Sequence, residues 1–270
     1  MELPYIGTSD EDIISIGRKA AQFIGHHFQK KDFEEEAKDY DNSLVSFVDR
    51  ESEKIITDGL TNLFPDFGFI TEEDTISQDD QRDYYWIIDP LDGTTNFIHG
   101  LEEFSVSIAL STRDHELIWG AVIDVMREDV FQAAKGQGAW KNGKRLQLEP
   151  TSLEKSLIAT GFPYYRFDHK EEYLRHFQRF MGACRGMRRC GSAALDMAHI
   201  ASGIYGGFFE YDLHLWDVAA GALIVEEAGG IVTDFDQDRE AWKRSGHIVA
   251  GEMQCHREMF DLMLQRSSES

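Results

Sequence analysis

Residues 84–100 read YYWIIDPLDGTTNFIHG and place two aspartates three positions apart, directly after an apolar run. The apolar run predicts a buried strand that ends on Asp89. Pro90 lacks a backbone N–H and interrupts regular strand pairing, and Gly93 can adopt backbone angles that are closed to other residues. The TTNF that follows predicts a short helical turn whose first N–H groups have no intrahelical partner. Such a turn binds phosphate well.

Asp89 and Asp92 flank this turn and can reach a common point. Two crowded carboxylates repel each other unless one of them keeps a proton. A Mg²⁺ ion between them would let both stay ionised, because hard oxygen ligands suit this cation. The spacing alone does not establish a Mg²⁺ site, since Asp92-Gly93 is also typical of an ordinary turn and Asp89 could be an acidic residue of a loop.

Further acidic residues occur at the ends of other expected elements. Glu72 and Glu73 follow a short strand directly. Asp217 precedes an apolar helix, a position typical of an N-cap, and capping is compatible with metal binding. Asp49 lies in the first part of a helix, where a solvent-exposed face is the simplest expectation.

The pattern of apolar residues predicts alternating α and β elements. Helical spacing begins near Thr8 or Ser9 and recurs from about Ser46 to Phe64, ending before Pro65. A strand-rich middle follows, and strands and helices alternate after it. Strands are expected within residues 68–70, 84–89, 104–112, 116–125, 129–136, 156–162, 205–212 and 230–235, with a hairpin at 136–146, and helices at 170–181, 192–202, 217–228 and 253–265. This mixture predicts layered α and β architecture.

Composition limits the classes of partner. The chain has 270 residues, 42% of them hydrophobic, and 49 acidic against 27 basic residues give a formal charge of −22. Such a surface repels phosphate backbones and anionic lipid, so binding to nucleic acid or to a membrane surface is not expected. Most of the acidity favours solubility, and some carboxylates could be ligands for hard cations.

Cysteine usage and the N-terminal residues predict a cytoplasmic location. The three cysteines, Cys184, Cys190 and Cys255, form no Cys-x-x-Cys spacing, which is typical of a reducing compartment. The N-terminal sequence MELPYIGTSDED lacks the basic and then apolar form of a signal peptide. No apolar run approaches the length that spans a membrane.

Four acidic segments together resemble the inositol monophosphatase family of Mg²⁺-dependent, lithium-sensitive phosphatases. The two long ones are DPLDGTTNF and WDVAAGALIVEEAGG, and the others are FITEED and NSLVSFVD, in the expected order and spacing. The resemblance covers nearly the whole chain. It implies an α+β fold, a layered αβαβα sandwich, formed by residues 1–270 as a single catalytic domain of two intimately packed halves, roughly 1–145 and 146–270.

The resemblance also implies the metal ligands, with two or three Mg²⁺ ions in each active site. Glu72, Asp89 and the carbonyl of Leu91 match the ligands of the first ion, and Asp89, Asp92 and Asp217 match those of the second. A third, weaker ion lies near the position of Glu72 in the family. Thr94 and Asp49 match a pair that orients and deprotonates the attacking water, so Thr94, Asp49 and Glu72 are the expected catalytic residues.

Substrate contacts are implied by the same segments. Backbone N–H groups of Gly93, Thr94 and Thr95 match a phosphate cradle, and Ala193 and Glu210 match contacts to the hydroxyls of the substrate, beside Asp92 and Asp217. Lys38 matches a lysine of a loop that approaches the site. A homodimer is expected from the resemblance alone.

The expected reaction is hydrolysis of a small phosphate monoester, inositol monophosphate first, by a metal-activated water. Residues 161–169 differ from the animal inositol enzymes and border the substrate, so histidinol phosphate, fructose 1,6-bisphosphate, NADP and 3′-phosphoadenosine nucleotides remain alternatives. Thr95 stands where nucleotide-directed relatives often carry lysine, which favours inositol-type monoesters. A partner protein that has kept the fold without catalysis is a third possibility, and loss of a metal ligand would be its sequence sign.

Overall fold

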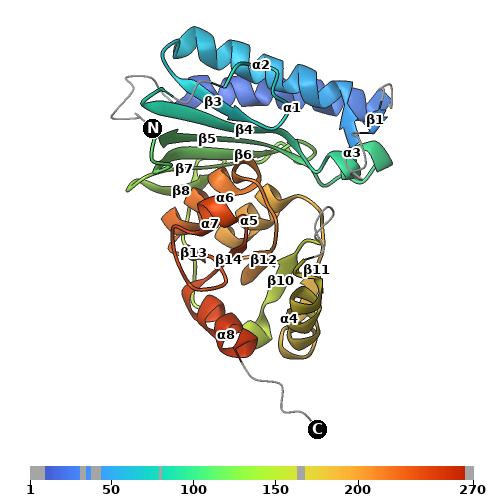
Figure 1. Cartoon of the computed structure of the whole chain (residues 1–270), viewed down its shortest axis with the longest axis vertical. Coiled ribbons are helices and arrows are strands. Elements are labelled where there is room, and N and C mark those ends of the chain that lie inside the picture. Colours follow the sequence, from blue (N-terminus) through green and yellow to red (C-terminus); the bar gives the residue numbers. More distant parts are fainter. Residues whose placement is uncertain (1–9, 31–34, 38–43, 79–80, 163–167, 265–270) are drawn as a thin grey trace.

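Two long amphipathic helices form the first layer of the fold (Figure 1). They are α1 (Asp10–Lys30) and α2 (Phe47–Leu63) in the computed structural model, which describes residues 10–30, 35–37, 44–78, 81–162 and 168–264. The first turn of α1 carries three acidic residues, which interact favourably with the positive end of the helix dipole. Helix α2 ends before Pro65, as its sequence predicts. A two-stranded antiparallel ribbon, β1 (Glu35–Ala37) and β2 (Leu44–Ser46), lies between the two helices in the chain.

A seven-stranded sheet forms the second layer, with strand order β3-β4-β5-β6-β7-β8-β9. Strand β3 is parallel to β4, and every other neighbouring pair is antiparallel. The expected hairpin is confirmed, with Asn142 and Gly143 at positive φ in its turn. The strands are β3 (Gly68–Thr71), β4 (Tyr84–Asp92), β5 (Ser105–Thr112), β6 (Leu117–Asp124), β7 (Val130–Ala134), β8 (Gly138–Lys141) and β9 (Lys144–Leu146).

Two apolar helices form the middle layer. Helices α5 (Ala193–Ala201) and α6 (Leu215–Glu227) are buried almost all round, which is typical of helices that lie between two sheets. Their side chains share one core with residues of both sheets, among them Ile87 of β4 and Phe208 of the second sheet. Helices α5 and α6 therefore join the two sheets through this shared core.

A five-stranded mixed sheet forms the fourth layer, with strand order β11-β10-β12-β14-β13. Strand β10 is parallel to both of its neighbours, and β14 is antiparallel to both of its own. The strands are β10 (Leu157–Thr160), β11 (Gly186–Arg188), β12 (Gly207–Glu210), β13 (Ile231–Thr233) and β14 (Ile248–Gly251).

The last layer consists of α4 (Lys170–Ala183) and α8 (Met253–Met263), which pack on the outer face of the second sheet. Figure 1 shows the order of layers from α1 and α2 at one end to α4 and α8 at the other. The layered αβαβα sandwich and the α+β class are thus confirmed. The first sheet ends at Leu146, and the division into halves near residues 145 and 146 remains a prediction. Among the described residues, none of the helices has both the length and the apolar character needed to cross a membrane.

Several short elements were not expected from the sequence. They are α3 beyond its first turn (Thr94–His99), the one-turn helices η1 (Leu153–Lys155) and α7 (Trp242–Ser245), and the strands β1, β2, β11 and β14. Strands of three or four residues give too few positions for an alternating pattern, and pairing with a neighbouring strand decides them. The prediction that strand pairing ends on Asp89 was wrong, because β4 continues to Asp92.

Candidate active site

Strand β4 carries two aspartates past an irregularity in its pairing with β5. Asp89 pairs with Ser107 and Asp92 pairs with Ser105, so three steps on β4 correspond to two on β5. Pro90, which has no N–H to donate, lies in this bulge. The carboxylate of Asp89 accepts a hydrogen bond of 2.9 Å from the N–H of Leu91. The two aspartates are 2% and 8% exposed, so both carboxylates are buried.

Glu72 reaches the same place because β3 and β4 are parallel. Thr71 pairs with Ile88, so Glu72 leaves the sheet beside Asp89 at the shared carboxyl edge. Burial raises the pKa of Asp89, and the charge of Glu72, which repels that of Asp89, raises it further. This repulsion is relieved if one of the two carboxyl groups holds a proton or if a cation lies between them.

Gly93 starts the turn that follows β4 and becomes the N-cap of α3. Its φ is 100°, and a Cβ atom at this position would lie 2.9 Å from the carbonyl oxygen of Glu103, so only glycine fits. The predicted helical turn is confirmed by α3, whose first N–H groups have no partner within the helix. Thr94 and Thr95 are the first two residues of α3 and stand next to the aspartates.

Thr94 contacts the first turn of α2. Its hydroxyl lies 2.8 Å from Oδ1 of Asp49 and 3.0 Å from the carbonyl oxygen of Leu91. Asp49 is 2% exposed, so the expectation that it lies on a solvent-exposed helix face was wrong. The reason is tertiary, because α2 packs against β4 with this side of the helix.

Asp217 comes from the middle layer. Helix α6 begins at Leu215, so Asp217 is its third residue rather than the N-cap that the sequence suggests. Its Oδ2 accepts a hydrogen bond of 2.6 Å from the N–H of His214, which holds the first turn closed. The hydroxyl of Ser107 donates to the carbonyl of Trp216 at 3.2 Å and anchors α6 to β5 opposite Asp89.

The N-terminus of α5 holds Asp92 in place. Oδ2 of Asp92 accepts hydrogen bonds from the hydroxyl of Ser192 and, at 2.8 Å, from the N–H of Ala194. Ser192 is also the N-cap of α5, since its hydroxyl accepts from the N–H of Leu195. Ala193, an expected substrate contact, is the first residue of this helix and is buried.

Burial raises the pKa of each carboxylate in this group. Burial is the largest cause for Glu72, Asp89 and Asp217, and repulsion among the same acids adds to it. Burial raises the pKa of Asp92 to about 6, although its hydrogen bonds to Ser192 and Ala194 lower it. A divalent cation would remove this repulsion and let all four ionise, so the donor set fits magnesium.

Glu210 lies at the end of β12, at the border of this acidic group. It is 8% exposed, and burial raises its pKa to about 8, with Arg189 opposing the shift and Asp92 adding to it. A Cβ atom on Gly161 would lie 1.8 Å from Glu210 Oε1, so the chain that leaves β10 passes directly over this carboxylate. Glu210 thus lies against Gly161, and its contact with a substrate remains a prediction. Lys38 lies outside the described residues.

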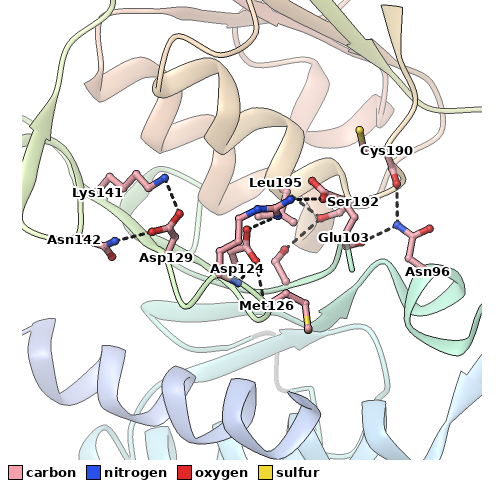
Figure 2. Close-up of polar contacts among 12 residues, drawn as sticks. Asn96, Glu103, Asp124, Met126, Asp129, Lys141, Asn142, Cys190, Ser192 and Leu195 are labelled. Atoms are coloured by element: carbon pink, nitrogen blue, oxygen red, sulfur yellow. Dashed lines mark hydrogen bonds and ion pairs between the residues drawn. The ribbon is translucent and has the colours of Figure 1, made fainter. Parts of the chain in front are cut away.

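Asn96 links α3 to the segment that precedes α5 (Figure 2). Its side-chain N–H₂ donates to the carbonyl of Glu103 at 2.7 Å and to the carbonyl of Cys190 at 2.8 Å. The turn that begins α3 and the residues that hold Asp92 are therefore fixed relative to each other. Sequence reasoning missed this role, because asparagine within a short helix has no distinctive pattern.

Other supporting residues were also missed. Glu53 is fully buried and accepts hydrogen bonds from the N–H groups of Glu73 and Thr75, at 2.8 and 2.7 Å, which fixes the chain after β3. It lies four residues after Asp49, on the same face of α2, and this spacing could have revealed it. Ser192, directly before an apolar helix, carries the usual signature of an N-cap.

The fold agrees with the comparisons to known proteins. The family model for the inositol monophosphatase family matches residues 10–269, and the chain belongs to this family. Nus factor SuhB from Pseudomonas aeruginosa is 42% identical over 247 residues, which cover 88% of this chain and 89% of that protein.

Two solved structures show the same fold. An IMPase from Thermotoga maritima is 32% identical, with a TM-score of 0.83 over 94% of this chain and 95% of its own. An IMPase/NADP phosphatase complexed with Mg²⁺ and phosphate is 22% identical, with a TM-score of 0.82 over 96% of this chain and 95% of its own. The second likeness concerns the fold alone.

Proposed function

We propose that this protein is a Mg²⁺-dependent phosphatase that hydrolyses a small phosphate monoester, most readily inositol monophosphate. The observation that carries the proposal is the convergence of four carboxylates with raised pKa values, from β3, β4 and α6, beside the N-terminus of α3. A phosphate monoester is a dianion, and its hydrolysis needs charge neutralisation and positioning more than covalent help.

The acidic residues divide into two ligand sets. Glu72, Asp89 and the Leu91 carbonyl would hold one ion, and Asp89, Asp92 and Asp217 a second. A third ion would bind near Glu72. Bound magnesium supplies charge neutralisation and a coordinated water of lowered pKa. The Leu91 carbonyl has two lone pairs, so its contact with the Thr94 hydroxyl leaves one lone pair for a metal.

The protein's own groups position the reactants. The Thr94 hydroxyl, held by Asp49, would orient the attacking water, and Asp49 would take up its proton. The backbone N–H groups of Gly93, Thr94 and Thr95 would hold the phosphate oxygens. Glu210 would accept a hydrogen bond from a hydroxyl of the leaving group, with the backbone of Ala193 and the carboxylate of Asp217 nearby.

Phosphate release by the purified protein, with and without Mg²⁺, tests the proposal. We expect release only with Mg²⁺, inhibition by Li⁺, and loss of activity in Asp92→Asn. Asp58→Asn, which changes an exposed acid of α2, is the matched control and should keep full activity. Turnover without metal, or an active Asp92→Asn protein, would exclude this mechanism.

A panel of monoesters assayed with one enzyme preparation identifies the preferred substrate. Inositol monophosphate, histidinol phosphate, fructose 1,6-bisphosphate, NADP and a 3′-phosphoadenosine nucleotide should be compared by kcat/KM. The proposal expects the highest value for inositol monophosphate. A higher value for any of the others would keep the chemistry and change the substrate.

A second candidate function comes from the relatives. The Pseudomonas aeruginosa protein, at 42% identity, is named as a Nus factor, so a role through a partner rather than through catalysis has specific support. All four principal acids are present here, which favours retained catalysis. To separate the two roles, SuhB of Pseudomonas aeruginosa can be replaced by this chain or by its Asp92→Asn variant. Growth of the resulting strains is then compared. Rescue by the inactive variant would show that catalysis is not needed.

A homodimer in the cytoplasm remains part of the proposal. Sedimentation equilibrium should give twice the monomer mass of 30.9 kDa.

A further inference from the structure

A second group of side chains that could bind a metal lies apart from the acidic site, on the second sheet. His169, Asp212 and His247 each offer a donor atom, and the three atoms lie within 4.8 Å of one another. All three residues are half-buried, so the group is neither fully exposed nor sealed from solvent. None of the three belongs to the proposed reaction.

Two of these residues are brought together by the pairing of β12 with β14. Glu210 pairs with Ile248, so Asp212 and His247 leave the two strands at the same end. A backbone hydrogen bond of 2.9 Å from Leu213 to Gly246 holds this end closed. Their separation is therefore set by the sheet, with 3.9 Å between His247 Nδ1 and Asp212 Oδ1.

His169 comes from a different part of the chain, at the N-cap of α4. Its ring stacks on Tyr211, with centroids 5.1 Å apart, and lies 4.6 Å from the ring of His247. Tyr211 stacks in turn on Phe235 at 4.1 Å, so the rings that orient His169 are themselves packed. Three segments that are distant in sequence thus converge on one point.

One carboxylate oxygen of Asp212 provides an independent observation. Its Oδ2 is buried and has no hydrogen-bond partner among the described residues. A buried carboxylate oxygen without a partner costs free energy, and a bound cation would remove that cost. The residue also adopts a φ of 61°, in the left-handed region, so the turn that presents this carboxylate is an uncommon one.

We propose that His169, Asp212 and His247 form a binding site for Zn²⁺, or for a similar borderline divalent cation, with water as the fourth ligand. Two imidazoles and one carboxylate are a ligand set that zinc uses in proteins. Ligand atoms around tetrahedral zinc are about 3.3 Å apart, so small side-chain rotations would close the set. The hydrogen bond of 3.3 Å from the Asp212 N–H to His247 Nδ1 would be replaced if that nitrogen bound the metal.

The charges around the site favour a cation. Glu172 Oε2 lies 3.8 Å from His169 Nδ1, and the whole chain carries a formal charge of −22. Magnesium would bind here poorly, because it prefers an all-oxygen set.

Zinc binding to the full chain, freed of metal with a chelator and then kept in excess Mg²⁺, tests the proposal. Excess Mg²⁺ occupies the acidic site, so competition with a chromophoric zinc chelator reports the remaining site. We expect one zinc ion per chain. His247→Gln and Asp212→Asn should each weaken its binding about 100-fold or more, since loss of an indirect supporting group already costs up to that much.

His26→Gln, which changes an exposed histidine of α1 at the opposite end of the layers, is the matched control and should bind as the wild type does. X-ray absorption of the zinc-loaded protein should show two imidazole nitrogens at about 2.0 Å. Circular dichroism checks that the variants fold. Equal zinc affinity in the wild type and both variants, or a spectrum with oxygen ligands alone, would overturn the proposal, whatever the outcome for phosphatase activity.

Discussion

The hydroxyl of Thr94 lies 2.8 Å from Oδ1 of Asp49, across 45 positions of sequence. This contact joins the N-terminus of α3 to the first turn of α2, and both residues border the four carboxylates. A hydroxyl held by a buried carboxylate is a suitable device for orienting a water molecule.

Removing the Thr94 hydroxyl should reduce catalysis without unfolding the protein. We expect Thr94→Ala to lower kcat by about 10²- to 10⁴-fold, the range typical of a lost proton-transfer group. Thr94→Ser keeps the hydroxyl and should retain most activity, and Asp49→Asn should resemble Thr94→Ala. Steady-state kinetics at saturating Mg²⁺ measures the effect. Equal kcat for Thr94→Ala and Thr94→Ser would contradict the assigned role.

Neutralising Asp92 should stabilise the metal-free protein at neutral pH. Burial raises the folded-state pKa of Asp92 to about 6, above the ordinary value of an aspartate. A carboxylate with a raised pKa costs stability once pH exceeds the unfolded value, and the full cost applies above the folded value. Asp92→Asn should therefore gain about 1–3 kcal/mol at pH 7.5, and the gain should shrink as pH falls towards 4.

Thermal unfolding in a chelating buffer across this pH range checks that result. Added Mg²⁺ should reverse the order of stability, because the wild type binds the cation and the variant has lost a ligand. The same variant should be inactive, so stability and activity change in opposite directions. A destabilised Asp92→Asn at pH 7.5 without metal would show that the cost of burying the Asp92 charge is not the dominant effect.

Replacing Gly93 should damage both folding and activity. Alanine at this position would adopt an unfavourable φ of 100° and place its Cβ 2.9 Å from the Glu103 carbonyl. We expect Gly93→Ala to lose about 2–4 kcal/mol of unfolding free energy. Gly100→Ala is the control, because it has φ of 79° with open space around the new Cβ, and it should lose about 1 kcal/mol. Urea denaturation compares them, and equal losses would rule out the clash.

Removing the Asn96 side chain should loosen the turn that is proposed to bind phosphate. Asn96→Ala leaves the carbonyls of Glu103 and Cys190 without their donor, at a cost of about 1–3 kcal/mol. KM should rise more than kcat falls, because the turn positions phosphate rather than the water. His99→Ala, at the exposed end of α3, should leave KM unchanged. An unchanged KM in Asn96→Ala would mean that α3 is held by other contacts.

Much of the fold was visible in the sequence, because its signals are local. Helical spacing and Pro65 gave the extent of α2, and alternation gave β5. Predictions from local sequence were less accurate where a tertiary contact outweighs the local preference of the backbone. Regular pairing was expected to end at Pro90, yet β4 continues through a bulge because β5 still pairs with Asp92. Helix α6 begins two residues before Asp217, since the Asp217 carboxylate takes the N–H of His214.

The candidate site divides in the same way. The acids at strand ends and the glycine turn beside them could be predicted from local sequence, because a proline, a glycine and an apolar run restrict the backbone locally. Three features depend on tertiary packing: Asp49 is buried against Thr94, Ser192 and Ala194 hold Asp92, and His169 meets Asp212 and His247. These contacts join residues far apart in the chain, and the packing of layers, which no local pattern encodes, brings them together.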